Sequence, residues 1–140
     1  MITLKENTIS VEDYLTIRSE VGWNVLSHSQ AKKALENSLY VVGAYDDGNL
    51  VGMGRIVGDG AVICYIQDLI VTPVYQKNGV GSLMIQELIR FVDGIREKDS
   101  QMMLCLMCAK GREQFYEKHG FLARPTDNLG PGMIQYLKNI

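Results

Sequence analysis

The sequence predicts an α/β protein built on a mixed β-sheet, and three observations carry that prediction. Strand-like apolar runs alternate with segments of helical periodicity along the 140-residue chain. The turn signal "DDGN" between two strand-like runs predicts an antiparallel hairpin. A long amphipathic helix between two later runs predicts that those two strands are parallel. The expected order is β-α-α-β-β-β-α-β-α-β-β.

The first half of the chain carries start and stop signals for its elements. Residues 2–6 have the pattern of a first strand. Ser10 and Ser27 each precede a helix-like segment and are followed three residues later by Asp or Gln, which resembles a capping box. Gly22 is expected to end the first helix, and the second is expected to reach about Asn37. The hairpin around "DDGN" supplies the second and third strands.

The second half is expected to hold the central strand and the helix that crosses the sheet. The run "AVICYIQDLIV", residues 61–71, is apolar at nearly every position, as in a strand covered on both faces. In the following helix Val80, Met84 and Leu88 share one side, which predicts packing against the sheet. The later elements are expected at residues 102–108, 111–119, 121–124 and 132–139.

Length and composition limit the classes to which the protein can belong. A chain of this size without a linker, repeat or low-complexity segment predicts one domain, residues 1–140. The formal charge of -2 gives no attraction to nucleic acid or anionic lipid, so we expect neither as a partner. The N-terminus lacks a leader pattern and no apolar run could span a bilayer, so we expect a cytoplasmic protein.

The cysteines do not indicate a disulfide framework, because there are three of them, an odd number. Cys105 and Cys108 have the C-x-x-C spacing that also occurs in zinc and redox sites. In a strand over residues 102–108, however, residues three apart face opposite sides, and no second Cys or His pair completes a metal site. We therefore expect small apolar residues in a sheet and no metal.

The polar loop "QKNGVGS", residues 76–82, lies where a strand leads into a helix, and glycine amides at a helix N-terminus favour an anion. It lacks the Lys of a P-loop, and Met84 stands where a dinucleotide-binding motif requires glycine. The pattern V-x-P-x-x-Q-x-x-G-x-G is present instead, as Val71, Pro73, Gln76, Gly79 and Gly81. This pattern resembles the coenzyme A pyrophosphate loop of the GNAT superfamily of N-acetyltransferases.

A second motif and the element order extend the resemblance along nearly the whole chain. The stretch "FYEKHGF", residues 115–121, is similar to the family signature F-Y-x-x-x-G-F. The resemblance implies a single GNAT-type domain in which the parallel fourth and fifth strands splay apart. It also implies acetyl-CoA as cosubstrate, with its pantetheine arm in that gap and its pyrophosphate on the loop. The residues implied in binding it are Leu69, Ile70, Val71, Gln76, Lys77, Asn78, Gly79, Val80, Gly81 and Ser82.

Two side chains are candidates for the chemistry. Tyr116 matches the family's tyrosine that gives a proton to the departing thiolate; without the motif, it would be interpreted as a core tyrosine. Asp68 is a lone carboxylate in an apolar strand, and it either takes the proton of the amine or satisfies backbone amides where the strands splay. Glu113 is a weaker candidate for the base.

The acceptor side is less well defined. Trp23, in the loop between the first two helices, is either an aromatic wall for an amine or a core anchor. Cys108 stands where many relatives have an asparagine that contacts the cofactor, which puts that contact in doubt. The expected activity is acetyl transfer to a primary amine of a small molecule or peptide. The alternative is a non-catalytic module that senses acyl-CoA. Acceptor identity and a homodimeric state stay open.

Overall fold

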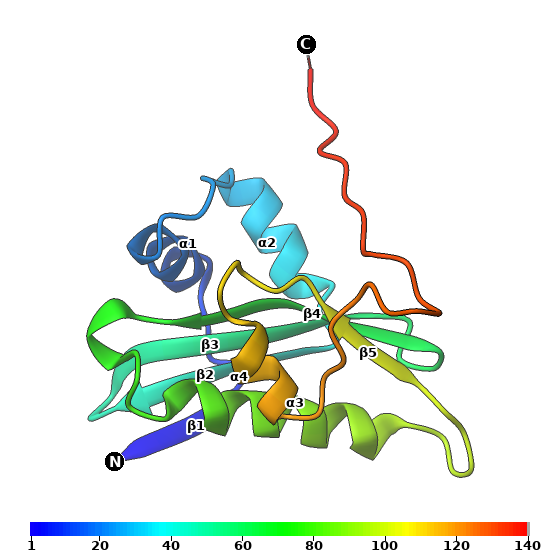
Figure 1. Ribbon diagram of the computed structural model, residues 1–140. Helices are drawn as coiled ribbons and strands as arrows, with labels where there is room; N and C mark the ends of the chain where they lie inside the picture. Colours follow the sequence, from blue (N-terminus) through cyan, green and yellow to red (C-terminus); the bar gives the residue numbers. More distant parts are fainter. Residues whose placement is uncertain (140) are drawn as a thin grey trace. The chain divides into compact units, whose positions relative to one another are not determined.

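The computed structural model describes residues 1–139 and divides into two units, which meet in the sequence between Leu106 and Met107 (Figure 1). The first unit holds a five-stranded sheet and three α-helices. The described residues of the second unit hold one short helix. From the first strand to this helix, the observed order of elements confirms the predicted order.

The sheet consists of β1 (Ile2–Glu6), β2 (Tyr40–Asp46), β3 (Asn49–Gly58), β4 (Ile63–Val71) and β5 (Met103–Leu106), side by side in that order. Neighbours from β1 to β4 are antiparallel, whereas β4 and β5 are parallel, as predicted. In the β2–β3 hairpin, Asp47 and Gly48 have positive φ angles of 50° and 81°. A tight turn requires such angles, which is why "DDGN" predicted it correctly.

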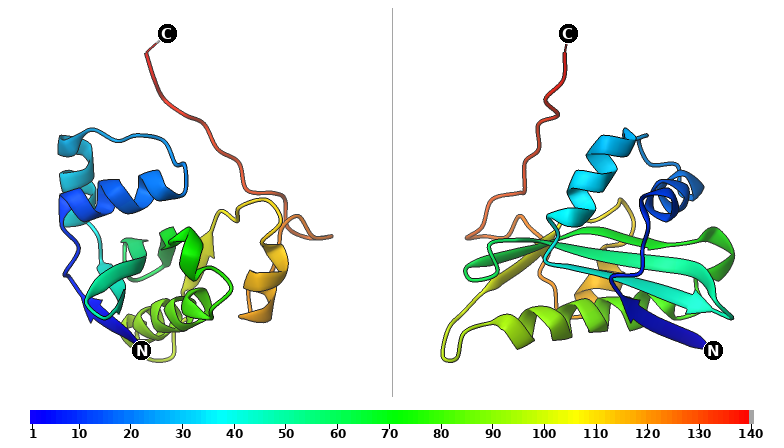
Figure 2. Two further views of the ribbon diagram at one scale, coloured as in Figure 1. Left: turned by 90° about the vertical axis from the view of Figure 1, so that its left-hand side faces the viewer. Right: turned by 180° about the vertical axis from the view of Figure 1, so that it is seen from behind.

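The helices of this unit are α1 (Val11–Glu20), α2 (His28–Glu36) and α3 (Val80–Ile95). The first two cover one face of the sheet and α3 covers the other (Figures 1 and 2). The Ser10 and Ser27 side chains each accept a hydrogen bond of 3.0 Å from the amide three residues on, as predicted. No helix within residues 1–139 is long and apolar enough to cross a membrane.

The sheet has an apolar core on each face. On the α1–α2 face the core cluster contains Tyr14, Ile17, Ala31, Val41, Met53 and Ile70. On the other face, two glycines of β3 let α3 approach closely. A Cβ atom on Gly52 would lie 2.9 Å from the Met84 sulfur, and one on Gly54 would lie 2.9 Å from Leu88. Larger residues at these positions would push α3 away from the sheet.

A β-bulge interrupts β4 at Gln67. Arg55 of β3 pairs with Asp68, and the next residue, Ile56, pairs with Ile66, so Gln67 has no partner on β3. Side chains alternate between the two faces of a regular strand, and an extra residue shifts that alternation. Residues before and after the bulge therefore face differently from what simple alternation predicts.

The bulge turns Asp68 toward α1. Ile66 lies on the α3 face, because its register continues to Tyr40, whose ring stacks on Phe91 of α3 at a centroid distance of 4.1 Å. Asp68 and Ile70 lie on the opposite face, where Ile70 belongs to the α1–α2 core. A carboxylate is thereby aimed into the space beneath the first helix.

The parallel strands separate after four residue pairs. Residues Ile63–Ile66 of β4 pair with Met103–Leu106 of β5, and the register stops there. Residues 67–71 of β4 continue without a β5 partner. This separation confirms the predicted splay of the fourth and fifth strands.

The fifth strand is shorter than expected, because its ladder with β4 ends where the bulge begins. Cys105 lies in the strand and is half-buried, whereas Cys108 lies beyond it and is exposed. The expectation of a sheet residue is therefore wrong for Cys108. Within residues 1–139, no group of three or more His, Cys, Asp or Glu side chains is placed to hold a metal.

The second unit contains α4 (Glu113–Lys118) followed by irregular chain. The closing strands expected at residues 121–124 and 132–139 are wrong, since the described residues after α4 form neither helix nor strand. A strand forms only where a neighbouring strand accepts its backbone bonds, and the sheet of the described residues pairs neither segment. The prediction of a single domain stays a prediction.

Candidate functional site

The loop between β4 and α3 is anchored at its start by two side chains. A short 3-10 turn, Pro73–Tyr75, follows β4. The Gln76 side chain folds back, and its Nε2 donates to the Val71 carbonyl at 3.0 Å. The Tyr75 hydroxyl donates to Oδ2 of Asp46 on β2 at 2.5 Å, a bond that raises the pKa of Tyr75. The residues that follow therefore start from a fixed position.

The N-terminus of α3 presents backbone amides that no N-cap side chain covers. Gly79 is the N-cap residue, with φ 84°, and makes no side-chain capping bond. Lys77, which is exposed, also has a left-handed φ of 72°. Left-handed residues before a helix turn successive N–H groups toward one side, where the helix dipole adds partial positive charge. A Cβ atom on Gly79 would meet nothing within 4 Å, so this approach is open. The arrangement suits a phosphate group.

All predicted cofactor residues lie in the first unit, in two adjoining stretches. Leu69, Ile70 and Val71 form the end of β4 that β5 does not pair with. Residues 76–82 form the loop and the first turn of α3. The structure thus brings these residues together, and their roles stay predictions.

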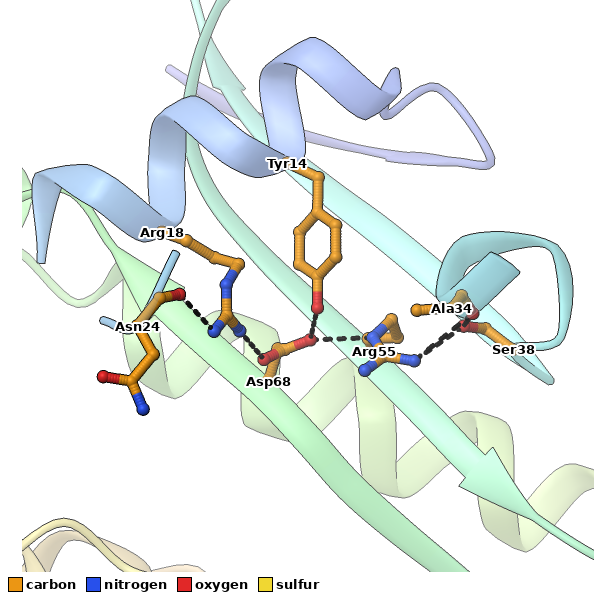
Figure 3. Close-up of polar contacts among 7 residues, drawn as sticks. All are labelled: Tyr14, Arg18, Asn24, Ala34, Ser38, Arg55 and Asp68. Carbon is orange, nitrogen blue, oxygen red and sulfur yellow. Dashed lines mark hydrogen bonds and ion pairs between the residues drawn. The ribbon is translucent and has the colours of Figure 1, made fainter. Parts of the chain in front are cut away.

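Asp68 is fully buried and hydrogen-bonded by three side chains (Figure 3). Its Oδ2 accepts bonds from the Tyr14 hydroxyl at 2.6 Å and from Arg55 Nε at 2.7 Å. Its Oδ1 accepts from Arg18 Nη1 at 3.4 Å. We call these four residues the Asp68 cluster. The expected alternative for Asp68, backbone amides as partners, is wrong, because its partners are side chains.

The two arginines of the Asp68 cluster reach different parts of the structure (Figure 3). Arg55 Nη1 donates to the Ala34 carbonyl at 3.3 Å and to the Ser38 hydroxyl at 3.2 Å, at the end of α2. Arg18 Nη2 donates to the Asn24 carbonyl at 3.0 Å, in the loop between α1 and α2. Burial and the Asp68 carboxylate raise the pKa of Tyr14 to about 12, so its hydroxyl remains a donor at neutral pH.

Trp23 lies in the same loop and is 38% exposed. The core-anchor alternative is therefore wrong for this residue. Its ring lies against the Arg18 guanidinium, with 5.3 Å from the guanidinium carbon to the ring centroid. Its amide donates to the Arg18 carbonyl at 3.1 Å. Trp23 thus offers one aromatic side to solvent and the other to a cation of its own chain.

The motif "FYEKHGF" forms the end of α4. The Phe121 amide donates to the Tyr116 carbonyl at 3.1 Å and the Gly120 amide to the Glu117 carbonyl at 3.1 Å. Gly120 has φ 94°, and the Phe121 and Tyr116 rings meet edge to face at 5.9 Å. This is a Schellman ending, in which glycine supplies the left-handed residue and two apolar side chains close the turn. The motif therefore fixes the position of Tyr116 on its helix.

Tyr116 has surroundings that keep its hydroxyl protonated. Burial raises its pKa, and the nearby Cys108, when ionised, raises it as well. The pKa of Cys108 is itself raised by burial and by the Glu113 carboxylate, whose Oε1 lies 3.9 Å from the sulfur. The same oxygen of Glu113 accepts the Gly111 amide at 2.9 Å. A tyrosine in this state can supply a proton at neutral pH.

Sequence reasoning missed Tyr14, Arg18 and Arg55 as partners of Asp68. One signal was available in the sequence. Arg55 is the only charged residue in the strand-like run "LVGMGRIV", and Asp68 is the only charged residue in the next run, "AVICYIQDLIV". Unpaired charges are costly to bury, so two lone opposite charges in neighbouring strands indicate a pair.

Comparison with known proteins adds an independent line of evidence. The profile of the "Acetyltransferase (GNAT) domain" matches residues 36–122, more than half of the chain. An uncharacterized N-acetyltransferase (ycf52-like) of Prochlorococcus marinus is 28% identical over 125 residues, which cover 86% of this chain and 67% of that protein. The histone acetyltransferase TAP1 of Glycine max is 30% identical over 133 residues. That match covers 87% of this chain but only 56% of the Glycine max protein.

Solved structures share the fold over the full chain. A probable acetyltransferase, SA2161, of Staphylococcus aureus is 29% identical, with a TM-score of 0.85 over 99% of this chain and 100% of that one. The GNAT family protein SP0256 of Streptococcus pneumoniae is 32% identical, with a TM-score of 0.82 and the same coverage. Both likenesses extend across the splayed strands and the glycine loop.

Proposed function

This chain belongs to the GNAT acetyltransferases, whose members transfer acetyl groups, and we propose that it moves the acetyl group of acetyl-CoA directly to a primary amine. The observation that carries the proposal is the uncapped N-terminus of α3, next to the part of β4 that β5 leaves unpaired. A long ligand with a pyrophosphate at one end needs both features: amide donors for the charge and a free strand edge for the arm.

The binding mode follows from that arrangement. The pyrophosphate would lie on the amides at residues 79–81, with Lys77 at the rim. The pantetheine amides would bond to the backbone of Leu69–Val71, as an added strand would. A GNAT family acetyltransferase from Elizabethkingia anophelis, 17% identical with a TM-score of 0.66, has been solved with acetyl-CoA bound, which supports the choice of ligand.

The reaction needs two proton transfers. The neutral amine attacks the thioester carbonyl, the carbon–sulfur bond breaks, and the amide forms. The nitrogen loses one proton to water or a base, and the thiolate of CoA gains one. By its match to the family signature, Tyr116 is the donor of the second proton. Its raised pKa keeps it protonated until the thiolate develops.

The acceptor would be an amine of a small molecule or a peptide. The exposed face of Trp23 and its loop offer a surface for a cationic amine. The name of the Glycine max relative, a histone acetyltransferase, favours peptide amines in the first trials, although this chain covers about half of that protein. A cytoplasmic location and a homodimer remain predictions.

Acetyl-CoA binding and free-thiol release test the proposal. Calorimetry should detect acetyl-CoA binding, and a panel of peptide and small-molecule amines should include at least one that releases thiol. Tyr116→Phe should lower kcat by about 10²–10⁴-fold and leave acetyl-CoA affinity unchanged, since the proton is needed only as the thiolate departs. Tyr136→Phe, at an exposed tyrosine of the same unit, is the matched control.

Two results would contradict the proposal in different ways. Tight acetyl-CoA binding without turnover on any amine would favour the acyl-CoA-sensing alternative. Turnover that survives in Tyr116→Phe within a few-fold would leave the acetyltransferase standing and remove Tyr116 from its proposed role.

A further inference from the structure

We infer that Asp68 and Arg18 are a positioning pair that holds the acceptor loop, residues 21–27, at a set distance from the cofactor strand, and that Asp68 is not the general base. The inference rests on the proposed function for its kinetic consequence, although its structural part does not. It assigns the most buried carboxylate of the described chain a task other than proton transfer.

The environment of Asp68 opposes a role as base. A general base must reach the proton of the amine directly or through one water molecule. Asp68 has no exposed surface and accepts three hydrogen bonds. Two guanidinium groups and one carboxylate also leave the Asp68 cluster with one net positive charge. The two arginines already pair with the carboxylate, so a further partner would have to displace one of them.

The contacts of Arg18 connect Asp68 to the acceptor loop (Figure 3). One nitrogen of its guanidinium bonds to Asp68 and another to the Asn24 carbonyl. The guanidinium carbon lies near two rings, 5.6 Å from the Tyr14 centroid and 5.3 Å from the Trp23 centroid. Its buried Nε has no hydrogen-bond partner among residues 1–139. Stacking and two bonds therefore set the orientation of Arg18, which in turn sets that of Trp23.

Arg55 and Arg18 both contact Asp68, but their other contacts lie in different elements. Arg55 makes the shorter contact with Asp68, 2.7 Å, and anchors to the end of α2 through Ala34 and Ser38. Arg55 alone balances the charge of Asp68. Arg18 makes the longer contact, 3.4 Å, and its other contacts lie in the acceptor loop. Removing Arg18 would thus leave a paired carboxylate behind and release the loop.

The link matters because Asp68 directly precedes Leu69, the first residue of the proposed pantetheine edge. A rigid path runs from that edge through Asp68 and Arg18 to Trp23. Releasing the loop would leave acetyl-CoA bound as before and leave Tyr116 untouched. It would weaken contacts that bind the amine equally in the ground state and in the transition state, which raises KM and leaves kcat unchanged. The expected kinetic signature is a raised KM for the amine.

The decisive variant is Arg18→Gln, with Tyr14→Phe as its matched control. Trp23 is the only tryptophan, so its fluorescence reports on the loop without any ligand. In Arg18→Gln, acrylamide quenching of Trp23 should rise about twofold, because the cation that covers one side of the ring is gone. Tyr14→Phe removes one bond to Asp68 but keeps Arg18 in place, so its quenching should match the unmutated protein. Equal quenching in all three proteins would overturn the inference.

Kinetics on the most active peptide amine separate positioning from catalysis. Arg18→Gln should raise the KM for the amine about tenfold, with acetyl-CoA affinity and kcat within about twofold. The acidic limb of the kcat/KM pH profile should stay where it is, since no base has been removed. A shift of that limb, or a loss confined to kcat, would overturn the positioning role. Failure of the unmutated protein to release thiol would instead contradict the proposed function and leave the fluorescence result to decide on the loop.

Discussion

The N-terminus of α3 and the Asp68 cluster lie at the two ends of one stretch of chain, and they treat charge in opposite ways. At α3, backbone amides point outward with no N-cap side chain to accept from them. At Asp68, a full charge points inward and its oxygens accept from three side chains. Between them lie residues 69–78, the end of β4 and most of the loop.

The contrast between the α3 amides and the Asp68 carboxylate shows which kind of polar group marks a ligand site. Donors that the protein leaves uncovered at its surface can exchange water for an anion at little cost. A buried carboxylate that is already matched by two cations cannot take a new partner without breaking the old ones. Perturbed or buried charge is therefore a weaker guide to the reacting groups than uncovered backbone.

The largest effect is expected at the buried end of this comparison. Asp68→Asn leaves the buried Arg55 and the half-buried Arg18 without a counter-charge, which should lower the free energy of unfolding by about 3–5 kcal/mol. Urea unfolding followed by circular dichroism measures it. Asp47→Asn, in a turn where Asn takes the same positive φ, should change stability by less than about 0.5 kcal/mol. Equal effects of the two changes would show that the ion pairs of the Asp68 cluster do not stabilise the fold.

The next effect is expected at the open end, and on binding instead of stability. Gly81→Val places a branched side chain in the first turn of α3, where the pyrophosphate would approach, so acetyl-CoA affinity should fall about 100-fold. Calorimetry measures it. Gly94→Val, near the other end of the same helix, is the control and should leave the affinity unchanged. Unaltered affinity in folded Gly81→Val would exclude this loop as the phosphate site.

A smaller effect separates backbone strain from helix propensity. The Cβ positions of both Gly79 and Gly94 are open, but only Gly79 has a left-handed φ. Gly79→Ala should therefore destabilise the protein by about 1–2 kcal/mol. Gly94→Ala should stabilise it by up to about 1 kcal/mol. Thermal unfolding of the two variants should shift in opposite directions; shifts of the same sign would mean that Gly79 does not need its conformation.

The smallest effect is a change in pH dependence at the Asp68 cluster. Tyr14 keeps its proton up to about pH 12 in the folded protein, whereas an unfolded tyrosine loses it near about pH 10. The folded state then binds more protons in this window, so stability falls as pH rises through it. Tyr14→Phe should make that fall shallower, and Tyr136→Phe should not. Urea midpoints between about pH 9 and about pH 11 measure both; parallel curves would contradict the prediction.

Much of the fold could be predicted because its signals are local. Ser10 and Ser27 cap helices through bonds that span three residues, and Asp47 and Gly48 form a turn by themselves. The glycine loop combines a local backbone conformation with the start of a helix. Such features depend on near neighbours, which the sequence displays directly.

Features that depend on distant partners could not be predicted in the same way. The bulge at Gln67 exists only in the register between β3 and β4, and it decides that Asp68 meets Tyr14 and Arg18. The strand-like composition of residues 132–139 likewise does not show whether a neighbouring strand forms backbone hydrogen bonds with them. A segment with strand-like composition becomes a strand only when a neighbouring strand pairs with it.

The bulge also decides which face of the sheet each β4 side chain occupies, and engineered versions of the strand must preserve this. If β4 kept Gln67 but paired with β3 without the bulge, regular alternation would place Asp68 on the same face as Ile66, toward Met84 and Leu88. A charge would enter an apolar layer, and both arginines would lose their counter-ion. Deleting Gln67 together with the bulge would preserve the faces, because Ile66 and Asp68 would then be neighbours on opposite sides. Chimeras that join β4 to strands from other acetyltransferases should therefore keep Gln67 and its bulge together or remove them together.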